Sequence, residues 1–90
     1  MKKAEYKIPG GKLIAVELKI SKNIIEYVKI SGDFFMHPEE SILDLEKQLK
    51  GVKTEDFPRY IDEFFVDRDI ILYGINPKDF KQVIKMALDN

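Results

Sequence analysis

The hydrophobic pattern of this chain changes its period once, within residues 30–38 (ISGDFFMHP). Before this stretch, apolar residues recur at every second position, as in strands with one buried face. After it, they recur at intervals of three and four, as in amphipathic helices. Strands that come first, with helices mostly afterwards, predict an α+β two-layer sandwich and not a doubly wound sheet. We therefore expect a mainly antiparallel sheet of about three or four strands covered by about three helices.

Three segments before the switch are predicted to be strands: residues 2–8, 13–20 and 24–30. The second has one apolar face, made of Ile14, Val16, Leu18 and Ile20. The third is expected to bury Ile24, Val28 and Ile30. Glu26 shares the parity of that apolar set, so either a bulge shifts the register or Glu26 lies near an open end of the strand.

Three segments after the switch are predicted to be helices. The first begins at Pro38, carries Glu39 and Glu40 in its first turn and ends at Gly51. The second covers about residues 57–66, and the third follows Asn76 as a cap, with Pro77 in its first position. Residues 70–73 form a short β-prone run, most simply a further strand.

Two glycine-containing loops interrupt the strands. Residues 9–11 (PGG) are either a tight turn between strands or a backbone surface pressed against a partner or ligand. At Gly32–Asp33 we expect a turn or bulge, with the Asp33 carboxylate accepting hydrogen bonds from backbone N–H groups. The following residues 34–36 (FFM) are too apolar for an ordinary loop. We expect one or two of them to anchor the helices on the sheet and another to lie at a surface that something else covers.

Length and composition limit the classes of function. Ninety residues predict a single domain, residues 1–90, and the net charge of -1 argues against a nucleic-acid-binding protein. The chain has no cysteine, and no apolar run approaches the ~18 residues that would span a membrane. We expect a mature, soluble protein of the cytoplasm.

The sequence shows no catalytic constellation. His37 is the only histidine, so a metal site is not expected, and the serines have no recognisable base beside them. Lys12 follows the glycine loop. It is either a solvated lysine at the start of a strand or a cation that meets an anion supplied by another chain.

Taken together, the motifs resemble one protein family. Residues 9–13 (PGGKL), then a hairpin, then residues 30–35 (ISGDFF) leading into residues 38–40 (PEE), are similar to the C-terminal accessory domain of lipoate–protein ligases. The similarity continues through a leucine-rich helix that ends at Gly51 and through residues 73–75 (YGI), and it covers nearly the whole chain. The large catalytic domain found in fused members of that family is absent here, so the resemblance implies either a separate subunit or an excised domain, and Met1 favours the subunit.

The resemblance implies a partner and a place for it. In that family, a catalytic chain or domain binds lipoate and ATP with Mg²⁺, forms lipoyl-adenylate and transfers the lipoyl group to lysines of acceptor domains. The small domain supports the adenylation step. This chain would then bind no cofactor of its own and would form a heterodimer with the catalytic chain, with no role for nucleic acid or a membrane. The expected partner-facing residues are Gly10, Gly11, Lys12, Gly32, Asp33, Phe34 and Phe35.

Two other functions remain open at the level of sequence. The chain could be a protein-binding adaptor or scaffold domain with no role in a ligase. It could also be a lipoyl acceptor, modified on Lys22 at the tip of the predicted hairpin, although Ser21 and Asn23 are not the acidic and small apolar neighbours that such a lysine would require.

Overall fold

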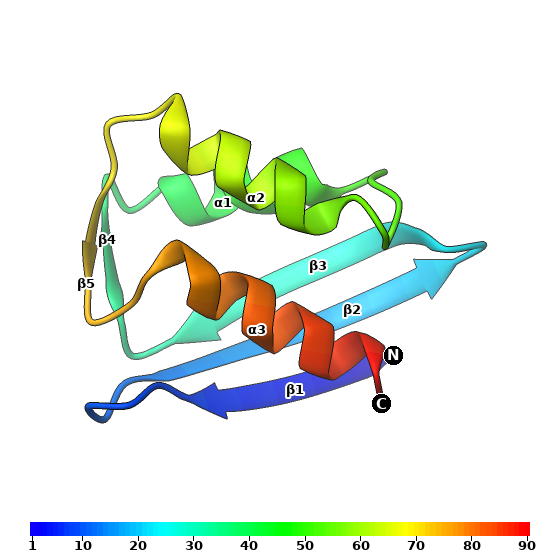
Figure 1. Ribbon diagram of the computed structural model, residues 1–90, viewed down its shortest axis with the longest axis horizontal. Helices are drawn as coiled ribbons and strands as arrows, with labels where there is room; N and C mark the ends of the chain where they lie inside the picture. Colours follow the sequence, from blue (N-terminus) through cyan, green and yellow to red (C-terminus); the bar gives the residue numbers. More distant parts are fainter.

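The computed structural model describes residues 1–90 and consists of a three-stranded sheet, a two-stranded ribbon and three helices. The elements are β1 (Lys2–Lys7), β2 (Leu13–Ser21), β3 (Ile24–Gly32), β4 (Phe35–His37), α1 (Ser41–Leu49), α2 (Phe57–Val66), β5 (Ile71–Tyr73) and α3 (Pro77–Leu88). β1, β2 and β3 form an antiparallel sheet in that order, and β4 pairs with β5 at one end of the molecule (Figure 1). This arrangement confirms the predicted α+β fold.

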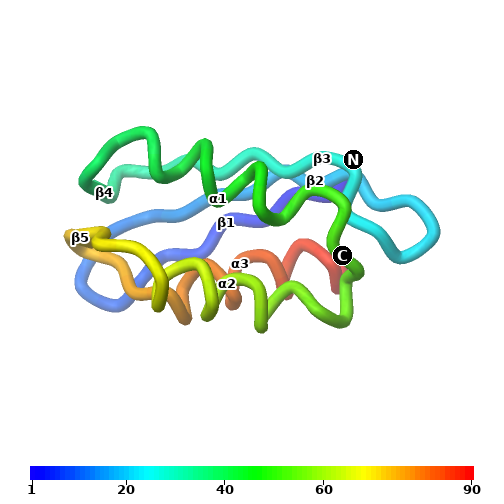
Figure 2. The backbone as a smooth tube through the Cα atoms, turned by 90° about the horizontal axis from the view of Figure 1, so that it is seen from above, coloured from blue at the N-terminus to red at the C-terminus, as the bar shows by residue number.

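The helices form the second layer. α3 packs on β1 and β2, α1 packs on β3, and α2 contacts both α1 and α3. Figure 2 shows α2 and α3 side by side on one side of the sheet. The chain ends are tied together: the Lys2 ammonium donates a hydrogen bond to the Asn90 carbonyl (2.6 Å), and the Asn90 amide donates one to the Lys3 carbonyl (2.6 Å). None of the three helices is both long enough and apolar enough to cross a bilayer.

The β2–β3 pairing contains a bulge, one of the two explanations offered for the parity of Glu26. Lys19 lies opposite Tyr27 and Ile20 lies opposite Ile25, so Glu26 is an extra residue in β3 and the strand is bulged there. The bulge places Ile25 in the core, whereas Ile24 is only partly buried. The prediction that Ile24 faces the core was therefore wrong, because the shift in register exchanges the two neighbours.

Two of the three helices begin where the sequence predicts. α2 and α3 have the predicted positions, and the Asp79 carboxylate accepts a hydrogen bond from the Asn76 N–H (2.8 Å), as in a capping box. α1 begins at Ser41 and not at Pro38. The chain is still extended in β4 up to His37, and residues 38–41 form a turn in which the Ser41 N–H donates to the Pro38 carbonyl (3.1 Å).

Residues 35–37 form a strand that the sequence analysis did not predict. Residues 71–73 are the further strand expected near that position, but they pair with β4 and not with the main sheet. Met36 of β4 is buried and Leu72 of β5 is partly buried against the core. The ribbon is thus joined to the domain through its inner face.

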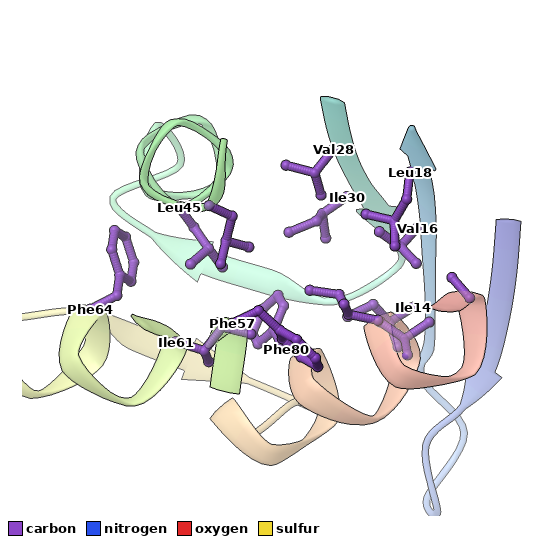
Figure 3. Packing of buried hydrophobic residues seen from close by; sticks show 14 of the residues in the cluster. Ile14, Val16, Leu18, Val28, Ile30, Leu45, Phe57, Ile61, Phe64 and Phe80 are labelled. Carbon is purple, nitrogen blue, oxygen red and sulfur yellow. The ribbon is translucent and has the colours of Figure 1, made fainter. Parts of the chain in front are cut away.

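One cluster of 20 buried apolar residues connects the layers. Figure 3 shows side chains from the sheet, such as Val16 and Ile30, converging with Leu45, Ile61 and Phe80 of the helices. Phe80 lies at the centre, with no exposed surface. Its ring meets the Phe34 ring edge-on (centroids 5.7 Å apart) and stacks on Phe65 (5.5 Å). Phe34 therefore anchors the start of the ribbon to α3.

Candidate partner-binding site

Two loops that are distant in sequence meet beside the ribbon. The Leu13 N–H donates a hydrogen bond to Oδ1 of Asp33 (2.6 Å), and the Asp33 N–H donates one to the Leu13 carbonyl (3.2 Å). This confirms the expected role of Asp33 as an acceptor for backbone N–H groups. The pair of bonds fixes the β1–β2 loop against the turn that follows β3.

Gly32 makes this junction possible. A Cβ atom at residue 32 would collide with the Leu13 carbonyl oxygen and would lie only 2.8 Å from the Phe34 ring. The backbone of the neighbouring strand and a buried ring cannot move away easily, so only glycine allows the two segments to approach this closely.

The β1–β2 loop is a tight turn, which was the simpler of its two interpretations. The Ile8 N–H donates to the Lys12 carbonyl (2.7 Å), and the Gly11 N–H donates to the Ile8 carbonyl (3.0 Å). Gly10 and Gly11 have φ values of 107° and 109°, which other residues rarely adopt. A Cβ at either position would touch nothing within 4 Å, so the loop is open to its surroundings.

Lys12 runs from this loop across the β5–α3 connection to the ribbon. A Cβ atom on Gly74 would lie 2.6 Å from Cγ of Lys12, so the lysine stem lies directly on that glycine. The ammonium nitrogen is 5.7 Å from the centroid of the Phe35 ring, within the range of a cation–π interaction. No carboxylate lies within ion-pair distance of Lys12, unlike the lysines that pair with Glu17, Glu26 and Asp62.

The two phenylalanines of the Gly-Asp-Phe-Phe motif have different environments. Phe34 is buried against Phe80, whereas Phe35 is 65% exposed. The structure thus divides the segment as expected, with Phe34 and Met36 anchoring it and Phe35 at the surface.

A groove separates the glycine loop from the segment around Gly74. It has a volume of about 410 Å³, and its walls are Ile8, Pro9, Gly10, Lys12, Leu72, Gly74, Ile75 and Asn76. Residues 73–75 belong to the family resemblance and to the end of a predicted strand, but nothing in the sequence places them near Lys12. The continuous β-prone run of residues 70–73 was the available signal, but so short a run does not identify the strand to which it pairs.

The groups at this junction suit the binding of another molecule. No three histidine or acidic side chains are grouped as metal ligands would be, and His37 lies in β4 opposite Ile71. The junction presents one lysine, a glycine-rich loop and an exposed aromatic ring, which together suit contact with another molecule.

Comparisons with known proteins agree with this description. A family model described as bacterial lipoate protein ligase C-terminus matches residues 2–84. The lipoate-protein ligase A subunit 2 of Thermoplasma acidophilum is 40% identical over 74 residues, which make up 82% of this chain and 78% of the relative. In the solved structure of an archaeal bi-partite lipoate protein ligase and its E2 lipoyl domain, also from Thermoplasma acidophilum, one chain superposes with a TM-score of 0.83. That chain is 38% identical, and the match covers 90% of each chain. The chain therefore belongs to the family of the bacterial lipoate protein ligase C-terminus.

Proposed function

We propose that this chain is the accessory subunit of a two-chain lipoate–protein ligase. It docks on a separate catalytic chain and supports the ATP-dependent activation of lipoate to lipoyl-adenylate, before the lipoyl group is transferred to lysines of acceptor domains. The observation that carries the proposal is the match to a chain named as subunit 2 of such a ligase, most of whose length is covered. The same fold is present in a bi-partite ligase structure.

In this proposal the two chains of the ligase have different roles. In the proposal, the catalytic chain binds lipoate and ATP with Mg²⁺, and residues 1–90 act as one non-catalytic domain. We expect the contribution of this subunit to come from binding its partner and from ordering the partner's loops. The absence of cysteine is in keeping with a reducing compartment, and we place the complex in the cytoplasm.

The end of the molecule that carries the glycine loop is the part proposed to face the catalytic chain. It contains Gly10, Gly11, Lys12, Gly32, Asp33 and Phe35 at or near the surface, with Phe34 supporting them from the core. We propose that Lys12 approaches the phosphate groups of the nucleotide held by the partner. A lysine without a carboxylate partner suits that role, because its charge is available to an anion brought by another chain.

Mixing this chain with its catalytic chain is expected to give a 1:1 complex. Sedimentation velocity of the separate chains and of the mixture, at micromolar concentrations, measures this directly. A mixture that sediments as two independent species at every concentration would contradict the proposed subunit role.

A further inference from the structure

The outer face of the β4–β5 ribbon carries a group of exposed apolar side chains. Phe35 pairs with Tyr73 and His37 pairs with Ile71, and all four side chains point away from the core, whereas Met36 and Leu72 point toward it. Phe35, Tyr73 and Ile71 are 65%, 56% and 48% exposed. They account for three of the seven exposed large hydrophobic residues of the chain, on only six strand residues. We call Phe35, His37, Ile71 and Tyr73 the ribbon face.

Two strands of three residues are marginal on their own, and the outer side chains of this ribbon remain largely in contact with water. Aromatic residues grouped at a surface are also the residues that most often dominate the energy of a protein interface. The ribbon face therefore has the composition of a binding surface.

We propose that the ribbon face is the surface by which this subunit docks on the catalytic chain of the ligase. This inference rests on the proposed function, which supplies the partner, and it adds Ile71, Tyr73 and His37 to the loop residues already discussed. Docking through this face presents Lys12 to the partner at the same time, because its ammonium lies over the Phe35 ring. The surface thus combines an apolar patch with one cation that has no ion-pair partner in this chain.

An apolar patch beside an unpaired lysine is complementary to a partner chain that holds an anionic substrate. The complement of the ribbon face is an apolar surface bordered by negative charge, and the nucleotide phosphates bound by the catalytic chain provide such charge. A second copy of this chain fits less well. A two-fold pairing through so small a face would bring two Lys12 ammonium groups into the same interface, where like charges repel.

Affinity measured by isothermal titration calorimetry against the catalytic chain tests the assignment, with two matched pairs of variants. Tyr73→Ser and Ile71→Ser alter the ribbon face. Tyr27→Ser, on β3 away from the ribbon, and Val66→Ser, at the end of α2, remove side chains that are 41% and 81% exposed elsewhere. We expect Kd to rise about tenfold or more for the ribbon variants and to change by less than about twofold for the controls. Circular dichroism confirms that each variant is folded before its affinity is measured.

The outcomes separate this inference from the function on which it rests. If the wild-type chain does not bind the catalytic chain, the proposed function fails. If the wild-type chain binds and folded Tyr73→Ser and Ile71→Ser chains bind equally well, the subunit role stands and the ribbon face is not the docking surface. If the isolated chain forms a dimer that Tyr73→Ser abolishes while binding to the catalytic chain is unchanged, the face belongs to a second copy and the inference is overturned.

Discussion

Replacing Phe80 by alanine is expected to lower the free energy of unfolding by about 3 to 5 kcal/mol. The Phe80 side chain is fully buried, and its ring contacts both Phe34 and Phe65. Its removal leaves a cavity between α3, α2 and the start of the ribbon that neighbouring side chains fill only in part. A domain of this length has about 5 to 13 kcal/mol of stability, so the loss is a large share of the total. Urea denaturation at 25 °C, followed by circular dichroism, measures the change.

Phe35→Ala is the matched control, since it removes the same side chain from the outer surface of the ribbon. We expect it to change the free energy of unfolding by no more than about 0.5 kcal/mol. Equal destabilisation by the two variants would mean that the Phe80 ring contributes no more to stability than an exposed ring, which would contradict its central place in the core.

Replacing Lys12 by alanine is expected to slow formation of lipoyl-adenylate about tenfold when the catalytic chain is saturated with this subunit. A tenfold loss corresponds to about 1.4 kcal/mol of transition-state stabilisation, a modest value for one cation near a reacting phosphate. Stability should change by no more than about 1 kcal/mol, because the half-buried Lys12 side chain makes no ion pair and loses only its contacts with Gly74 and the Phe35 ring. Release of pyrophosphate in the presence of lipoate and ATP gives the rate.

Two further variants sharpen the interpretation of Lys12. Lys12→Arg keeps the positive charge and should retain more of the rate than Lys12→Ala. Lys22→Ala removes a lysine from the β2–β3 hairpin, at the opposite end of the molecule (Figure 1), and should leave the rate unchanged. An unchanged rate for Lys12→Ala at saturation would remove Lys12 from the proposed mechanism. A change confined to Kd would assign Lys12 to docking alone.

The elements predicted correctly from the sequence are those with a long periodic pattern or a specific end signal. β2 has nine residues with a clear alternation, and α3 has a cap, a proline and a continuous apolar stripe. The alternation of apolar and polar residues breaks at Glu26, which indicated a possible bulge. The sequence did not show whether Ile24 or Ile25 is buried, because a shift of one residue exchanges them and both are equally apolar.

The ribbon could not be predicted, for a physical reason. Each of its strands has three residues, too few to show a period, and its partner strands are separated in the chain by two helices. The proposed site depends on that pairing. Gly32, Asp33 and Lys12 are recognisable from the sequence as loop residues, but the contact of Lys12 with Gly74 and Phe35 exists only because β5 returns beside β4.

The most direct test of the subunit role is adenylate formation by the catalytic chain from the same source, assayed with and without this chain. If this chain is the accessory subunit, lipoyl-adenylate accumulates faster than background only in the mixture, and the rate saturates at one equivalent of this chain. A catalytic chain that forms adenylate equally fast alone would rule out the proposed supporting role. Binding without any change in the rate would identify this chain as an adaptor and not as a subunit that supports lipoate activation.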